Sequence, residues 1–102
     1  MKIVKITYTT KLEFAEQNAT NIKNVMQDLR KLKYAGMFYD ACVGADGKTF
    51  IHTAFFKSDE EQKALNELPS FKHFQTELKA SMPEIPPKQE LVTLVGASYK
   101  IF

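Results

Sequence analysis

Residues 38–56 read FYDACVGADGKTFIHTAFF, and this stretch decides the fold. It contains two runs rich in aromatic and β-branched residues, Phe38–Val43 and Phe50–Phe56, on either side of Ala45-Asp46-Gly47-Lys48. An Asp-Gly pair between two such runs is the strongest short-range signal for a β-hairpin, because these residues tolerate the positive φ angles of a tight turn. We therefore expect a two-residue turn at Asp46-Gly47, in which Ala45 faces Lys48 and the numbers of paired residues sum to 93.

The sequence before the hairpin predicts a strand and then a long helix. Residues 2–10 alternate, with Val4, Ile6 and Tyr8 on one side, which is the period of a strand. From about residue 13 to residue 33, apolar side chains recur at three- and four-residue steps, and polar side chains cover the other side. This pattern indicates an amphipathic helix, which we expect to end near Gly36.

The sequence after the hairpin predicts a second helix. Ser58-Asp59-Glu60-Glu61 has the form of a capping box, so we expect a helix to begin there. Its apolar stripe continues through Pro69, which predicts one helix that is kinked or restarted at this proline. A short rigid linker is then expected at three further prolines, Pro83, Pro86 and Pro87.

A strand pattern returns over residues 90–98, with Gly96 at a bulge or bend. The resulting element order is βαββαβ. With right-handed crossovers, this order gives a ferredoxin-like α+β fold, an antiparallel four-stranded sheet with both helices on one face. A chain of 102 residues has room for one hydrophobic core, so we expect a single domain over residues 1–102.

Composition narrows the classes of function. The chain is 44% hydrophobic and 25% charged, which is typical of a globular domain, and its formal net charge of +2 gives no reason to expect a nucleic-acid or membrane partner. The RNA-recognition motif shares the element order, but residues 48–55 lack its glycine-aromatic signature. The apolar runs are too short to span a bilayer and no secretory signal is visible, so a cytoplasmic location is expected.

Both faces of the predicted hairpin are rich in large apolar side chains. In the expected register Phe50, Ala54 and Phe56 share one face, and Phe38 and Phe55 share the other. Two helices cover only one face, and a second copy of the chain is the simplest cover for the other. We therefore expect a homodimer through the sheet face. The alternative is a partly wet face with scattered apolar groups.

A resemblance to a known family lies in residues 50–59 and 68–74, which read FIHTAFFKSD and LPSFKHF. These segments resemble the strand-to-helix region of antibiotic-biosynthesis-monooxygenase-like proteins of the dimeric α+β barrel superfamily. The resemblance implies a barrel of two sheets around a pocket for a small apolar or aromatic molecule, and cofactor-free oxygenation as an activity to test. Phe56 and Ser70 stand where family members often carry Trp and His. The alternative is a non-catalytic dimeric interaction or sensing module, because the sequence shows no complete catalytic constellation.

The candidates for a ligand pocket share the predicted face on which a few polar groups lie among apolar ones, the mixture that small-molecule pockets use. They are Lys5, Thr7, Phe38, Asp40, Ile51, Thr53, Phe55 and Thr93. A dimer interface whose polar groups satisfy each other is an equally good explanation of this mixture. If the face does form a pocket, Thr53, Asp40 and Lys5 are expected to point into the cavity between two copies.

The secondary candidates for site residues are His52, Ser70 and His73. His52 is expected to face the helices as a hydrogen-bonded sheet histidine, with a proton acceptor or haem ligand as the alternative. His73 is expected at the boundary of the second helix, where it can reach a pocket rim near Ser70. Cys42 is expected to be a small buried hydrophobe, and it shares no face with His52 in the predicted register, so we expect no metal site and no bound cofactor.

Overall fold

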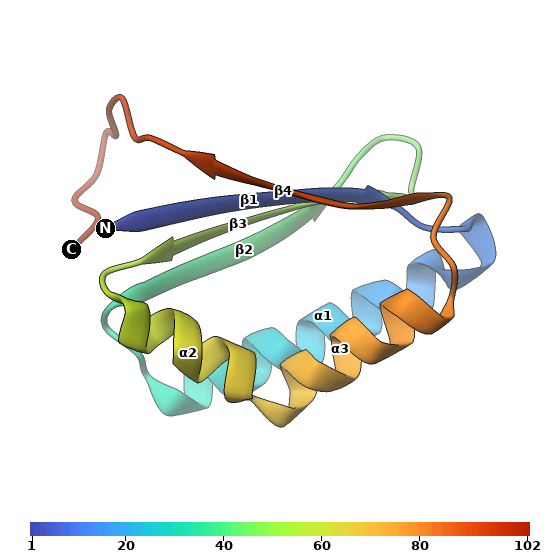
Figure 1. Ribbon diagram of the computed structural model, residues 1–102, viewed down its shortest axis with the longest axis horizontal. Helices are drawn as coiled ribbons and strands as arrows, with labels where there is room; N and C mark the ends of the chain where they lie inside the picture. The colour runs from blue at the N-terminus through green and yellow to red at the C-terminus, as the bar shows by residue number, and fades with distance from the viewer.

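The computed structural model describes residues 1–102 as one antiparallel sheet with the order β2-β3-β1-β4 and three helices. The elements are, in chain order, β1 (Lys2–Thr9), α1 (Leu12–Leu32), β2 (Met37–Val43), β3 (Thr49–Phe56), α2 (Asp59–Glu67), α3 (Pro69–Ala80) and β4 (Ile85–Val92). All three helices lie on one side of the sheet (Figure 1). The expected ferredoxin-like α+β architecture is therefore confirmed.

The hairpin has the predicted register but a different turn. Asp40 pairs with Thr53 and Cys42 with Ile51, so the numbers of paired residues sum to 93 as expected. A type I′ turn needs positive φ at both central residues, whereas only Gly47 has it here, at 74°. The Gly47 N–H donates to the Gly44 carbonyl at 3.0 Å, which places the turn at residues 44–47. The Gly44 N–H also donates to the Thr49 carbonyl at 2.8 Å, so the whole loop of residues 45–48 is centred on the predicted axis of pairing and the register is unchanged.

The second helical segment restarts at Pro69, as the sequence predicts. Leu68 is extended and separates α2 from α3, and the proline occupies the first turn of α3, where its missing N–H costs no helical hydrogen bond. The predicted capping box is present at the start of α2. There the Ser58 backbone N–H donates to the Glu61 carboxylate at 2.9 Å.

A last strand is present as predicted, but it is β4, over Ile85–Val92, so the predicted bounds of residues 90–98 and the predicted linker at Pro86 and Pro87 are wrong. β4 is an edge strand that pairs only with β1, and edge strands tolerate proline because some of their N–H groups face away from the ladder. Thr7 pairs with Lys88 and Thr9 with Ile85. The two prolines between Ile85 and Lys88 therefore lie where the register shifts, in a β-bulge.

The hydrophobic core lies between the helices and the sheet face that carries Tyr8, Phe50 and Phe56. From the helices, Ile22 and Val25 on α1 and a set on α2 and α3 pack against this face, namely Leu65, Phe71, Phe74 and Leu78. α1 and α3 run side by side beneath the sheet (Figure 1). None of the helices combines the length and hydrophobicity that a membrane crossing requires.

The opposite face of the sheet, which we call the open face, carries no helix (Figure 1). Phe38 is 46% exposed there and Ile51 is 37% exposed. The chain after β4 runs on this side, and Phe102 stacks on Phe38 with the ring centroids 5.2 Å apart. Cys42 is exposed on this face, so its prediction as a buried hydrophobe is wrong for the single chain.

Candidate functional site

Three neighbouring strands bring two phenols and an imidazole together on the helix side of the sheet. Tyr8 on β1 and Tyr39 on β2 flank His52 on β3. The Tyr8 hydroxyl lies 2.7 Å from His52 Nε2, and the Tyr39 hydroxyl lies 2.6 Å from His52 Nδ1. Both ring nitrogens of the histidine are therefore hydrogen-bonded, and the predicted direction of His52 toward the helices is confirmed.

Asn18 on α1 extends this chain of hydrogen bonds by one group. Its Nδ2 donates to the Tyr8 hydroxyl at 2.9 Å. Asn18 has no exposed surface, and its Oδ1 has no hydrogen-bond partner. Buried polar groups usually have a hydrogen-bond partner. The unpaired amide oxygen therefore makes Asn18 a candidate for a functional role. We call Asn18, Tyr8, His52 and Tyr39 the hydrogen-bond chain.

The hydrogen-bond chain carries no charge near neutral pH. Burial lowers the pKa of His52 to about 4, because the imidazolium ion would lose its hydration. Burial raises the pKa of Tyr8 and of Tyr39 above the ordinary value, so both phenols keep their protons. The chain can thus donate and accept hydrogen bonds, but it holds no ion at pH 7.

A cavity of about 370 Å³ lies beside this chain, and we call it the α3 cavity. Its walls are mostly apolar, and its polar groups come from the three residues of the sheet and from two side chains of α3. The lining residues are Ile6, Tyr8, Tyr39, His52, Phe71, Phe74, Gln75, Leu78, Lys79, Pro83, Pro86 and Pro87. The bulged prolines of β4 therefore form one wall of the cavity.

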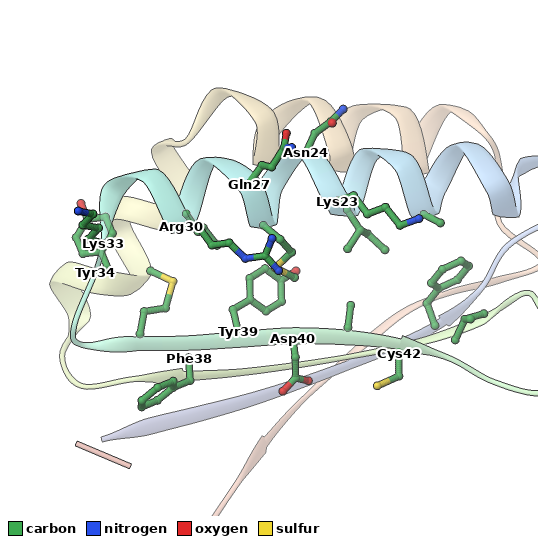
Figure 2. A pocket seen from close by; sticks show the side chains of 18 residues that line it. Lys23, Asn24, Gln27, Arg30, Lys33, Tyr34, Phe38, Tyr39, Asp40 and Cys42 are labelled. Carbon is green, nitrogen blue, oxygen red and sulfur yellow. The ribbon is translucent and has the colours of Figure 1, made fainter. Parts of the chain in front are cut away.

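A larger and more open groove of about 940 Å³ lies between α1 and β2. Figure 2 shows Arg30 extending from α1 toward the ring of Tyr39, whereas Phe38, Asp40 and Cys42 point away from the helix. Tyr39 lines both the groove and the α3 cavity. The groove is the more polar of the two spaces, because several charged residues line it, namely Lys23 and Arg30 on α1, Lys33 at its C-terminal cap and Asp40 on β2.

The residues predicted to line a pocket lie mostly on the open face. The register places Lys5 opposite Thr53 and Thr53 opposite Asp40, so these three form a row across β1, β3 and β2, as expected. Phe38 and Asp40 border the groove at the edge of β2, although their side chains point away from α1. Neither of the two cavities is lined by the other predicted residues of the sheet, namely Lys5, Thr7, Ile51, Thr53 and Phe55. Thr93 follows the end of β4, so its predicted place in the last strand is wrong.

The remaining candidates stand apart from both cavities. His73 is exposed on α3, and its Nε2 lies 3.4 Å from Glu77 Oε1. Ser70 lies in the first turn of α3, and its hydroxyl is buried without a partner. Neither residue lines the α3 cavity.

Sequence reasoning missed Asn18, which is the most buried polar residue of α1. A signal was present, because Asn18 stands between Ala15 and Ile22 in the apolar stripe of the helix, at three- and four-residue steps. A polar side chain in such a stripe faces the core. Its partner, the Tyr8 hydroxyl, becomes visible only when the position of α1 over the sheet is known.

Comparison with proteins of known structure identifies the fold of this chain. No protein-family profile matches the chain, and no curated protein matches it. An antibiotic biosynthesis monooxygenase of known structure superposes with a TM-score of 0.78 at 13% identity, over 94% of this chain and all of that one. Rv0793 from Mycobacterium tuberculosis gives 0.77 at 11% identity, over 96% of this chain and 98% of that one.

A third solved structure is a mutant of SnoaB from Streptomyces nogalater, described as a cofactor-independent oxygenase. It gives a TM-score of 0.66 at 11% identity, over 97% of this chain and 96% of that one. The fold of this chain is thus that of the antibiotic-biosynthesis-monooxygenase-like proteins, as its resemblance implied. At such low identity the likeness establishes the fold alone.

Proposed function

We propose that this chain binds a small, uncharged and largely apolar molecule in the α3 cavity. The observation that carries the proposal is the coincidence of an apolar cavity with a neutral chain of hydrogen-bonding groups at its wall. Ligand pockets combine apolar walls, which supply the favourable burial, with a few polar groups that fix orientation. A volume of about 370 Å³ has room for a molecule of two or three fused rings.

The chemistry of the wall favours an uncharged ligand. His52 is neutral at pH 7, and the phenols of Tyr8 and Tyr39 are protonated, so no fixed charge of the sheet faces the cavity. An ion would lose its hydration without gaining a partner of opposite charge on this side. The one lysine that lines the cavity, Lys79, is an exposed residue of α3 and not part of the buried wall.

A cavity-blocking variant tests this proposal. Gln75 is an exposed residue of α3 that lines the cavity, whereas the adjacent Thr76 is exposed and does not line it. Gln75→Trp is expected to fill the cavity and abolish binding of indane and 1-indanone in an NMR titration, and Thr76→Trp is expected to bind both as the wild type does. The proposal fails if the wild type binds neither probe, or if Gln75→Trp leaves binding unchanged.

Cofactor-independent oxygenation is a second candidate, favoured by the likeness of the fold to SnoaB and by the hydrogen-bond chain. In such a reaction an electron-rich substrate itself reduces dioxygen, so that one oxygen atom enters the product as a carbonyl and the other leaves as water. Tyr39, held by its hydrogen bond to His52, would donate its hydroxyl proton to the oxygen of the substrate and so stabilise the anion that forms when the substrate loses its own proton. Oxygen consumption with an anthrone, with no metal or flavin added, tests this activity, and Tyr39→Phe is expected to slow it.

The open face is proposed to form a homodimer. Phe38 and Ile51 are exposed there, and no helix covers them. Burial of side chains of this size contributes about 1.5–3 kcal/mol each. Native mass spectrometry at micromolar concentration is expected to show twice the chain mass, and a purely monomeric spectrum would exclude this interface. In the dimer, the row of Lys5, Thr53 and Asp40 would face the partner.

A non-catalytic interaction or sensing module is the alternative to both ligand-based functions. It requires the dimer but no occupied α3 cavity. Retention of a small molecule by the purified protein in native mass spectrometry therefore favours ligand binding, whereas a dimer that takes up neither indane nor 1-indanone favours the module.

A further inference from the structure

The direction of the hydrogen-bond chain can be assigned from its buried end. Asn18 Nδ2 donates to the Tyr8 hydroxyl, so the Tyr8 oxygen acts as an acceptor there. Tyr8 is only 1% exposed, and its hydroxyl makes one other hydrogen bond, to His52 Nε2. Its own proton must therefore go to Nε2, since the alternative is a buried hydroxyl that donates to nothing.

This assignment fixes the tautomer of His52. Nε2 accepts the Tyr8 proton and carries none of its own, so the single proton of the neutral imidazole lies on Nδ1. Nδ1 is 2.6 Å from the Tyr39 hydroxyl, to which it then donates. The Tyr39 oxygen is thus an acceptor toward His52, and its own proton has no partner within the protein.

The orientation of the Asn18 amide supports this direction. In the orientation of the structure, one buried acceptor, Oδ1, stays without a partner. If the amide were rotated so that its oxygen faced Tyr8, the NH₂ group with two protons would occupy the site that offers no partner. Unpaired buried donors are rarer than unpaired acceptors, because a carbonyl oxygen tolerates partial satisfaction better.

We propose that Asn18 orients the hydrogen-bond chain so that Tyr39 presents its hydroxyl proton to the α3 cavity, and that the ligand is recognised through a carbonyl oxygen. Tyr39 lines the cavity and is the one member of the chain that is not fully buried. The ligand class is then an uncharged ketone rather than a hydrocarbon. This inference rests on the proposed ligand site.

The first experiment reads the tautomer directly, without a ligand. In protein labelled with ¹⁵N-histidine, long-range ¹H–¹⁵N spectra are expected to show His52 protonated at Nδ1 and bare at Nε2. Protonation at Nε2 would overturn the assignment. Asn18→Leu removes the donor that sets the direction, so its His52 is expected to populate both tautomers. A variant that keeps the pure Nδ1–H form would show that Asn18 does not orient the chain.

The second experiment compares 1-indanone with indane, which has the same ring system and no carbonyl. Wild-type protein is expected to prefer the ketone by about three- to tenfold, the ratio that one hydrogen bond supplies. Tyr39→Phe is expected to remove the preference, and Tyr34→Phe, at an exposed tyrosine outside the α3 cavity, to keep it.

The outcomes separate this inference from the function on which it rests. Equal affinity of the wild type for both probes overturns the carbonyl recognition and leaves the ligand site standing. Binding of neither probe overturns the ligand site and the recognition together. A ketone preference that survives Tyr39→Phe assigns the contact to another group and overturns the inference.

Discussion

Acid should weaken this fold through His52, and the size of the effect can be worked out. His52 is 3% exposed, and burial lowers its pKa from 6.5 to about 4. Above pH 6.5 the imidazole is neutral in both the folded and the unfolded chain. Below pH 6.5 the unfolded chain binds a proton that the folded chain does not take up until about pH 4. The free energy of unfolding therefore falls as the pH falls through this window.

Each pH unit inside this window lowers the free energy of unfolding by about 1.4 kcal/mol. The loss from this one group is about 2 kcal/mol at pH 5 and about 3 kcal/mol at pH 4, relative to pH 7.5. This is a large share of the roughly 5–15 kcal/mol that stabilises a domain of this size. Well below pH 4 both states bind the proton, and His52 causes little further loss.

Urea unfolding followed by far-UV circular dichroism measures this loss at pH 7.5, 6 and 5, at one protein concentration because association adds stability. His52→Gln keeps hydrogen-bonding groups beside Tyr8 and Tyr39 but does not titrate. Its loss of unfolding free energy between pH 7.5 and pH 5 is therefore expected to be about 2 kcal/mol smaller than that of the wild type. His73→Gln, at the exposed histidine, is expected to keep the dependence of the wild type. If the free energy of unfolding depends on pH equally steeply in the wild type and in His52→Gln, the reasoning is refuted.

Three further substitutions test other parts of the structure. Gly47→Ala places a side chain at a φ of 74° with no steric obstacle, so thermal unfolding is expected to show a loss of about 1 kcal/mol from backbone strain alone. Ser58→Ala removes the hydroxyl of the capping box and is expected to cost about 1 kcal/mol in the same assay; an unchanged melting temperature would deny the cap a stabilising role. Thr53→Val alters the open face only, so stability is expected to change by less than about 0.5 kcal/mol and the affinity for 1-indanone to stay constant; a changed affinity would move the ligand to the open face.

The hairpin shows which features the sequence predicts and which it does not. Its register followed from the position of Asp46-Gly47 and from alternation, because a strand repeats every two residues and a shift by one would exchange its faces. The turn type did not follow. The Asp46 carboxylate accepts hydrogen bonds from the Thr49 hydroxyl and from two backbone N–H groups, and this arrangement leaves Gly47 as the one residue of the turn with positive φ.

The last strand and the cavity needed tertiary information. Three prolines predicted a linker, because proline removes a ladder donor, but β4 lies at the edge of the sheet, where that loss is tolerated. The alternation of β3 correctly separated His52 from Thr53. It gave no measure of how closely the helices fill the space beneath the sheet, so the α3 cavity could not be predicted from it.

The prolines of β4 also determine how this sheet can grow. An edge strand is a template to which a strand of another molecule can add, and stacked additions of that kind lead to fibrils. Pro86 and Pro87 have no N–H to offer an incoming strand, and the bulge twists the edge away from a straight ladder. Polymerisation along the β4 edge is therefore blocked, which leaves the β2 edge, with its exposed Val43, as the place where a destabilised chain would begin to aggregate.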